Sequence, residues 1–342
     1  MLLRAALGTT APMPSTVVVT HFDLDHWMGL KAFADASASG SARVRLIYPR
    51  FPGHLKPLQA ILLAYQTLHL TAPERSAMDL VRAWEGKAAA LERTAASAGY
   101  RFEAVGTRWK VLWPPEELGA SVSLAFNRIA KESEDLAQAY EPLGRALDWA
   151  KESWVNGDGT SQTDETSDGS TAPVDEDVPL FTEDEIAPEF DDDDLLDSYG
   201  TDNFADAPDE LRERLRKNRR DVQRINNELS LVLEETHGRL LNLGDIQKWG
   251  LNALLRSGAT QQCYDVILAP HHGTQASGKL TSNKFPWSRR VVAQNGAGHR
   301  PRLKKKFLSA RTLQLTNTAD VGSVAISAKY HAPPKYCRCQ RP

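Results

Sequence analysis

Residues 17–30 place four potential metal ligands directly after an apolar stretch. The stretch begins with three valines and a threonine, β-branched residues that are typical of a buried strand. The side chains that follow it are His21, Asp23, Asp25 and His26. Along an extended chain, alternation would place the first three on one side, and the next turn would return His26 to them. Imidazole nitrogen and carboxylate oxygen together suit zinc, manganese or iron, whereas calcium prefers oxygen alone. A polar loop after a buried strand is the alternative, but four such residues within six positions favour a metal site.

Three later segments also end an apolar strand pattern in ligand-type residues. Residues 240–245 end in Gly-Asp, which places the carboxylate of Asp245 at a strand tip. Residues 264–274 end in the pair His271 and His272, and residues 291–299 end in a glycine-rich loop and His299. Strand ends that converge are where folds of mixed α and β structure build their sites. We therefore expect these residues to meet the first group.

In this order, the motifs His-x-Asp-x-Asp-His, Gly-Asp, His-His-Gly-Thr and Gly-His resemble those of the metallo-β-lactamase fold. The branch that they resemble most is the soluble hydrolase domain of the ComEC/Rec2 competence proteins of DNA uptake. In that branch, as at Asp23 here, an aspartate stands where most of the superfamily has a histidine. The paired asparagines at 226 and 227 before a strand, and the closing strand pair at 313–327, add to the resemblance. It covers roughly 16–50, 104–116 and 222–328.

The resemblance implies an α+β fold, an αββα sandwich in a single domain over residues 1–342. Only about fifteen residues precede Val17, so the first N-terminal strands of that fold are expected to be missing. Either the chain starts further upstream, or a protein partner supplies the strands, or the sheet is incomplete and the protein impaired. An open sheet edge would invite pairing with a partner or with a second copy of the chain. Trp113 stands where relatives often have histidine, which leaves one metal position short of ligands.

By resemblance, the site binds two divalent metal ions, zinc or manganese. One ion is assigned to His21 and Asp23, the other to Asp25, His26 and one of His271 and His272, with Asp245 as the bridge. The catalytic set is Asp25, Asp245 and His299, and His299 would bind the scissile phosphate or protonate the leaving oxygen. The substrate-binding set is Thr274, His299, Arg300 and Arg302.

The charge is divided sharply along the chain. Residues 156–210 contain 20 Asp and Glu and no Lys or Arg, so the rest of a chain of net charge −3 carries +17. Such a basic body suits a polyanion, because bound Lys and Arg release counterions from nucleic acid. DNA is therefore the expected partner. Residues 156–207 are poor in core-forming residues and are expected to be a disordered acidic insertion, either a solubility segment or a mimic of nucleic acid.

Apolar residues at helical spacing predict helices over 58–70, 77–98, 124–154 and 208–228. The predicted helical flanks of the insertion are 117–155 and 208–222, and a basic tail occupies 329–342. The basic run at 212–220 fits either a solvated helix face or a phosphate contact.

Together these features predict a metal-dependent hydrolase, in first place a phosphodiesterase or nuclease that cleaves DNA by two-metal activation of water. The alternatives are a hydrolase of a small ester or nucleotide and a catalytically impaired interaction subunit. No apolar run approaches 18 residues, so no membrane span is expected. The N-terminal stretch is too short for a signal peptide, and three cysteines suggest no disulfide framework, which together predict a cytoplasmic protein.

Overall fold

The structure is a computed structural model. It describes residues 14–37, 40, 43–51, 56–68, 77–104, 106–152, 204–237, 239–273, 285–294 and 312–318. Thr274, His299, Arg300, Arg302, the tail at 329–342 and most of the predicted insertion lie outside the described residues, as do the side chains of Asp25 and Met28. What the sequence predicts for these residues therefore remains a prediction.

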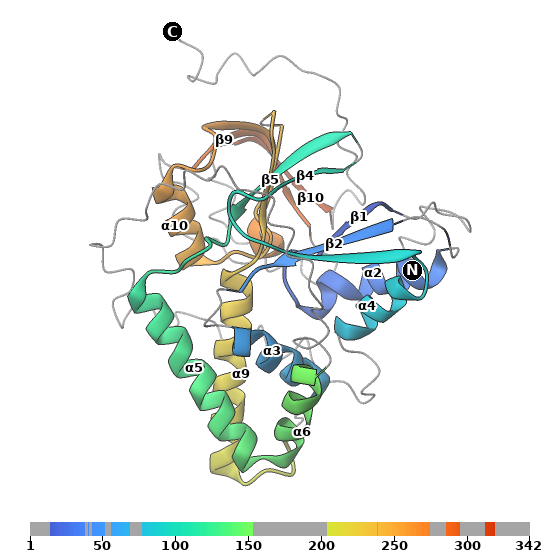
Figure 1. Cartoon of the computed structure of the whole chain (residues 1–342). Coiled ribbons are helices and arrows are strands. Elements are labelled where there is room, and N and C mark those ends of the chain that lie inside the picture. Colours follow the sequence, from blue (N-terminus) through green and yellow to red (C-terminus); the bar gives the residue numbers. More distant parts are fainter. Residues whose placement is uncertain are drawn as a thin grey trace.

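A small parallel sheet is formed by the N-terminal third of the chain (Figure 1). Its strands are β1 (Thr16–Val18), β2 (Arg43–Pro49) and β3 (Ala90–Ala96), with β2 in the middle. Parallel neighbours need crossover connections, and helices α2 (Leu24–Ala36), α3 (Lys56–Leu68) and α4 (Ala77–Glu85) lie in them. The side chains of Trp27 in α2 and Trp84 in α4 are fully buried in the main core, together with Leu46 of β2.

A larger sheet has the strand order β10-β9-β8-β7-β6-β5-β4. Its strands are β4 (Arg101–Ala104), β5 (Thr107–Trp113), β6 (Val232–Glu235), β7 (Leu240–Asn242), β8 (Cys263–Leu268), β9 (Trp287–Ala293) and β10 (Thr312–Asn317). The pairs from β4 to β7 are antiparallel and those from β7 to β10 are parallel. Helix α10 (Lys248–Ser257) makes the crossover from β7 to β8, and the 3₁₀ turn η3 (Pro270–Gly273) follows β8.

The two sheets are joined by a second hydrophobic cluster. Ile47 and Ala96 come from the small sheet, and Phe102, Val111 and Leu233 from the large one. Side chains alternate between the two faces of β2, which explains why its residues belong to different clusters. Leu46 belongs to the main core, and the next residue, Ile47, to the cluster between the sheets. This mixed arrangement of sheets and helices is consistent with the predicted metallo-β-lactamase-like α+β fold.

Four helices form a group on one side of the sheets (Figure 1). They are α3, α5 (Ala120–Ala139), α6 (Glu141–Ala150) and α9 (Asp209–Glu228). A buried polar network joins three of them: the Tyr65 and Ser133 hydroxyls donate to Asn218 Oδ1 at 2.6 and 2.8 Å. Since buried polar groups cost free energy unless they are hydrogen-bonded, this network fixes how α9 lies against α3 and α5.

Most of the predicted elements are confirmed, with two corrections. The single helix predicted over 77–98 is wrong in its second half, because α4 ends at Glu85 and residues 90–96 form β3. This alanine-rich segment has helical propensity, but pairing with β2 along seven residues overrides it. The helix predicted over 124–154 is two helices, divided at Tyr140 and followed by a proline in the first turn of α6.

Two further observations bear on the predicted environment. Among the described residues, no helix is long and apolar enough to cross a membrane. Cys263, at the start of β8, is disulfide-bonded. The sequence predicts no framework of several disulfides, and a single bonded cysteine among the described residues leaves that prediction standing.

Glu228 connects the end of α9 with the beginning of α10. Its side chain is buried, and its carboxylate accepts hydrogen bonds from the backbone N–H groups of Trp249 at 3.1 Å and Gly250 at 2.7 Å. Its backbone carbonyl accepts a hydrogen bond from Trp113 Nε1 at 2.6 Å. Carboxylates at a helix N-terminus satisfy N–H groups that have no partner within the helix.

Glu228 is expected to make folding stability depend on pH. Burial raises the pKa of its carboxyl from 4.5 to about 7, against the opposing effect of the Gly250 and Trp249 N–H groups. Because the folded state binds the proton more tightly, this contribution is complete below pH 4.5 and is lost as the pH rises to about 7. At about 1.4 kcal/mol per unit, the loss is about 3 kcal/mol. Urea unfolding of the wild type and of Glu228→Gln between pH 4.5 and 8 measures it. The variant should lack this part of the decline, and parallel curves for the two proteins would contradict the prediction.

Candidate metal centre

The first group of predicted ligands lies where β1 passes into α2. The chain bends at Thr20 to Phe22, and α2 begins at Leu24, so His21 and Asp23 lie in the connection and His26 in the first helical turn. The His26 N–H donates to the Asp23 carbonyl at 3.0 Å. The predicted alternation on an extended chain is wrong for Asp25, because the helix starts one residue before it.

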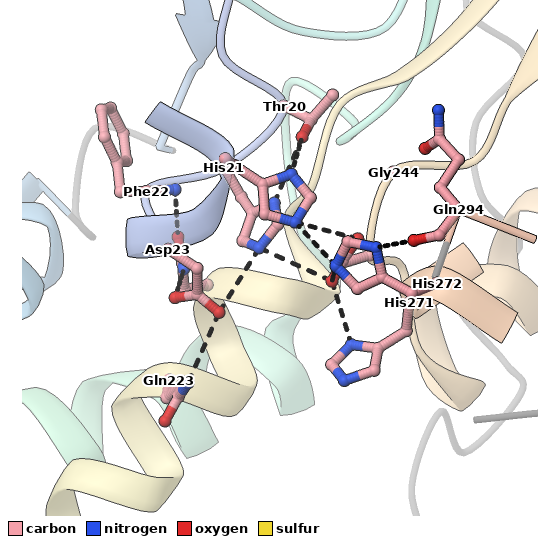
Figure 2. Close-up of polar contacts among 12 residues, drawn as sticks. Thr20, His21, Phe22, Asp23, Gln223, Gly244, His271, His272 and Gln294 are labelled. Atoms are coloured by element: carbon pink, nitrogen blue, oxygen red, sulfur yellow. Dashed lines mark hydrogen bonds and ion pairs between the residues drawn. The ribbon is translucent and has the colours of Figure 1, made fainter. Parts of the chain in front are cut away.

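Asp245 is the centre around which the predicted histidines gather. Figure 2 shows the side chains of His21, His271 and His272 close together. It follows β7 and is 4% exposed. Its carboxylate oxygens lie 3.8 Å from His21 Nε2, 3.4 Å from His26 Nε2, 3.1 Å from His271 Nδ1 and 3.7 Å from His272 Nε2. Residues separated by more than 200 positions are thus brought together, as the convergence of strand ends predicts.

The closest group consists of His21, His26 and Asp245, whose ligand atoms all lie within 4.8 Å of one another. Two further side chains border this trio. Asp23 Oδ2 lies 3.4 Å from His21 Nε2, and His272 Nε2 lies 3.3 Å from His26 Nε2. His272 Nε2 also lies 3.7 Å from Asp245, so the five side chains form one compact cluster.

The paired histidines of η3 have an unusual backbone. His271 and His272 have φ values of 48° and 55°, in the left-handed region that non-glycine residues rarely adopt. Each costs of order 1–3 kcal/mol. The His271 N–H donates to the Gly244 carbonyl at 3.1 Å, which ties the turn to the residue before Asp245. The strained turn brings both imidazoles to the same carboxylate.

On His21, His26 and His272, the ring nitrogen that faces away from Asp245 has a hydrogen-bond partner. Thr20 Oγ1 lies 3.2 Å from the Nδ1 atoms of both His21 and His26. His272 Nδ1 lies 3.0 Å from the Gln294 carbonyl, which can only accept. When Nδ1 carries the proton and donates it to such a partner, Nε2 keeps a lone pair that can bind metal. Outer partners fix metal-binding histidines in this way.

These residues fit a divalent cation. The lone pairs of His26 Nε2 and His272 Nε2 would repel each other at 3.3 Å, and a cation between them removes the conflict. Among the described residues, His21 Nε2 is buried and has no hydrogen-bond partner. Burial alone would raise the pKa of Asp245, but the neighbouring His21 and His271 hold it well below 3.8. Asp245 is thus an anion surrounded by imidazole nitrogens, a donor set suited to zinc or manganese.

A comparison with protein-family models bears on the same segment. The metallo-beta-lactamase superfamily model matches residues 1–100. That range includes β1, α2, β2 and β3, and with them His21, Asp23 and His26. Searches of curated proteins and of solved structures found no match.

Members of this superfamily are mostly hydrolases that bind divalent ions such as zinc, so the match supports a metal-dependent hydrolase. Nothing in the comparisons points to the ComEC/Rec2 branch specifically. Asp245, His271 and His272 lie beyond the matched residues, and their place beside the matched histidines comes from the fold itself.

Helix α9 fixes the position of Asp23. Asn226 Nδ2 donates to Asp23 Oδ1 at 2.7 Å, and Asn226 Oδ1 accepts the Phe22 N–H at 3.1 Å. Gln223 Nε2 lies 3.4 Å from Asp23 Oδ2. Gln66 of α3 donates to the Phe22 carbonyl. Both carboxylate oxygens of Asp23 thus have a partner in α9, and Oδ2 also faces His21.

Sequence reasoning did not identify Thr20, Gln223 or Gln294 as site residues. A threonine before a histidine carries no signal by itself, and Gln294 acts through its backbone carbonyl, which sequence patterns do not report. The pair Asn226-Asn227 was noted only as part of the resemblance. Its contact with Asp23 needs the tertiary fold.

The basic run of α9 is largely paired within the protein. Arg212 donates to the carbonyls of Phe204, Ala205 and Ala207. Arg214 pairs with Glu132 at 2.9 Å, and Arg220 lies 3.9 Å from Glu213. Of the two interpretations of this run, these contacts favour a solvated helix face over a phosphate contact.

Proposed function

We propose that this protein is a phosphodiesterase that hydrolyses DNA with two bound divalent ions, zinc or manganese. The observation that supports it most is the convergence of imidazole Nε2 atoms on the ionised Asp245, with the opposite ring nitrogens already held. A site assembled to this degree needs little reorganisation to bind metal. This preassembled set of ligands argues against the alternative of a catalytically impaired interaction subunit.

In this proposal, His21 and Asp23 would hold one ion, and His26, His272 and Asp25 would hold the other. Asp245, whose carboxylate lies within 4 Å of His21, His26 and His272, would contribute to both. Bound divalent ions lower the pKa of a water to about 7 and neutralise phosphate oxygens. The protein contributes a buried, pre-oriented set of donors, and His299 would donate a proton to the leaving oxygen.

DNA as the substrate is supported by charge. The chain outside 156–210 carries +17, and Arg300, Arg302 and Lys304 to Lys306 follow His299 directly in the sequence. Clustered Lys and Arg bind a polyanion through the release of its counterions. The internal pairing of the α9 arginines favours the second candidate, a hydrolase of a small ester or nucleotide.

The test is digestion of end-labelled single- and double-stranded DNA by the metal-loaded protein, with manganese, zinc or magnesium in turn. A small phosphodiester and a carboxylic ester serve as parallel substrates. Metal-dependent DNA cleavage that weakens steeply with salt supports the proposal. Cleavage of the small substrates alone, without salt dependence, favours the second candidate. No turnover of any substrate by folded, metal-loaded protein would overturn both.

We expect His272, and not His271, to be the ligand from the paired histidines. His272 presents Nε2 with Nδ1 held by Gln294, and it lies next to the His26 nitrogen. His272→Ala should therefore lower the cleavage rate by more than the roughly 100-fold that loss of an outer partner costs, and should remove one metal equivalent. His271→Ala is the matched control and should retain both ions. Loss of metal from the His271 variant alone would reverse the assignment.

A further inference from the structure

The Thr20 hydroxyl lies within hydrogen-bonding distance of both histidines of the first motif, and Figure 2 shows it beside His21. Its Oγ1 is 3.2 Å from His21 Nδ1 and 3.2 Å from His26 Nδ1. The two rings lie close together, with centroids 3.9 Å apart and planes inclined at 56°. One side chain thus contacts the outer nitrogens of both rings.

The chemistry of these three groups allows one arrangement in which both rings bind metal. Each Nε2 must offer a lone pair, so each Nδ1 must carry the proton. A hydroxyl oxygen has two acceptor positions, and Thr20 Oγ1 can accept from both Nδ1–H groups at once. If the hydroxyl instead donated to one Nδ1, the Nε2 of that ring would carry the proton and could not bind an ion.

Thr20 is itself held from two sides. Its carbonyl accepts the Leu231 N–H at 2.7 Å, which ties it to the start of β6. A Cβ on Gly244 would lie 3.5 Å from Thr20 Cβ and 3.1 Å from Ser230 Cβ, so the glycine next to Asp245 packs closely against this region. The residue that holds both rings is thereby fixed relative to the carboxylate that they face.

We propose that Thr20 is a positioning residue that accepts hydrogen bonds from His21 Nδ1–H and His26 Nδ1–H and so presents both Nε2 atoms to a divalent ion. The inference rests on the metal site of the proposed function but not on DNA as the substrate. Outer partners of this kind typically change metal affinity by about 10–100-fold.

The test compares Thr20→Val, which keeps the shape and removes the hydroxyl, with Thr20→Ser, which keeps the hydroxyl. Zinc and manganese affinities are measured on the folded full-length protein by competition with a chelator. Thr20→Val should bind metal about 10–100-fold more weakly, and Thr20→Ser should bind close to wild type. Thr67→Val is the control, because it removes a threonine hydroxyl that bonds the Leu63 carbonyl within α3. It should leave metal affinity unchanged.

A second readout reports the hydrogen bonds directly. In zinc-loaded wild type, proton NMR should show two downfield imidazole N–H resonances from His21 and His26 that exchange slowly with water. In Thr20→Val, both should move upfield and exchange faster, while the unfolding temperature of the metal-free protein changes little. Unchanged affinity and N–H resonances in Thr20→Val would overturn the inference, as would Thr20→Ser binding as weakly as Thr20→Val. Because neither readout uses DNA, failure to cleave DNA leaves this test intact.

Discussion

Replacing Asp245 with Asn is expected to abolish metal-dependent hydrolysis and to release at least one bound ion. The carboxylate is 4% exposed and faces His21, His26, His271 and His272 within 4 Å. Asparagine keeps the size but removes the charge and one acceptor oxygen. Since the proposal gives Asp245 to both ions, the rate should fall on the order of 1000-fold or more, about 4 kcal/mol of transition-state stabilisation.

The measurement is the cleavage rate at saturating manganese together with the metal content of the purified variant. Asp35→Asn is the matched control, because Asp35 is an exposed carboxylate of α2 that pairs with Lys31 at 2.9 Å. It should keep both the rate and the metal. Cleavage by Asp245→Asn at the wild-type rate, with two ions bound, would remove Asp245 from the site.

Gly244→Ala should destabilise the fold by about 2–5 kcal/mol and weaken metal binding with it. Gly244 has φ = 53°, and a Cβ there would lie 2.8 Å from the Leu231 carbonyl oxygen and 3.1 Å from Ser230 Cβ. The left-handed conformation costs an L-residue roughly 1–2 kcal/mol. Crowding against backbone adds about 1–3 kcal/mol, because the carbonyl cannot move without disturbing β6.

Gly258→Ala separates these two costs. Gly258 ends α10 with φ = 66°, and a Cβ there would meet nothing within 4 Å. It should therefore lose only the conformational part, roughly 1–2 kcal/mol. Urea unfolding and metal affinity of both variants make the comparison. Equal losses for the two glycines would show that crowding at Gly244 is unimportant.

The sequence predicted the parts of the site that follow from strand ends. Asp245 after β7 and His271 and His272 after β8 could be placed because an apolar strand followed by ligand-type residues is a local pattern. That these tips converge follows from the neighbouring positions of β7 and β8 in the sheet.

The rest depends on contacts that no local pattern encodes. Asn226 holds Asp23 across 203 positions, and the two histidines of η3 adopt positive φ values that non-glycine residues seldom show. The error at β3 has the same origin, because Ala90–Ala96 becomes a strand only through its partner β2. Propensity is a weak signal where tertiary pairing decides.

Helix α9 acts as a stiff rod between two distant parts of the molecule. Its 20 residues span about 30 Å. Asn218, midway along it, is locked to α3 and α5, and Asn226 and Glu228 near its end hold Asp23 and α10. Because α9 is held at both places, a shift of one part of the molecule moves the helix and, with it, the other part. The helical group and the metal centre should therefore melt as one cooperative unit, and bound metal should raise the melting temperature of helices that touch no ligand.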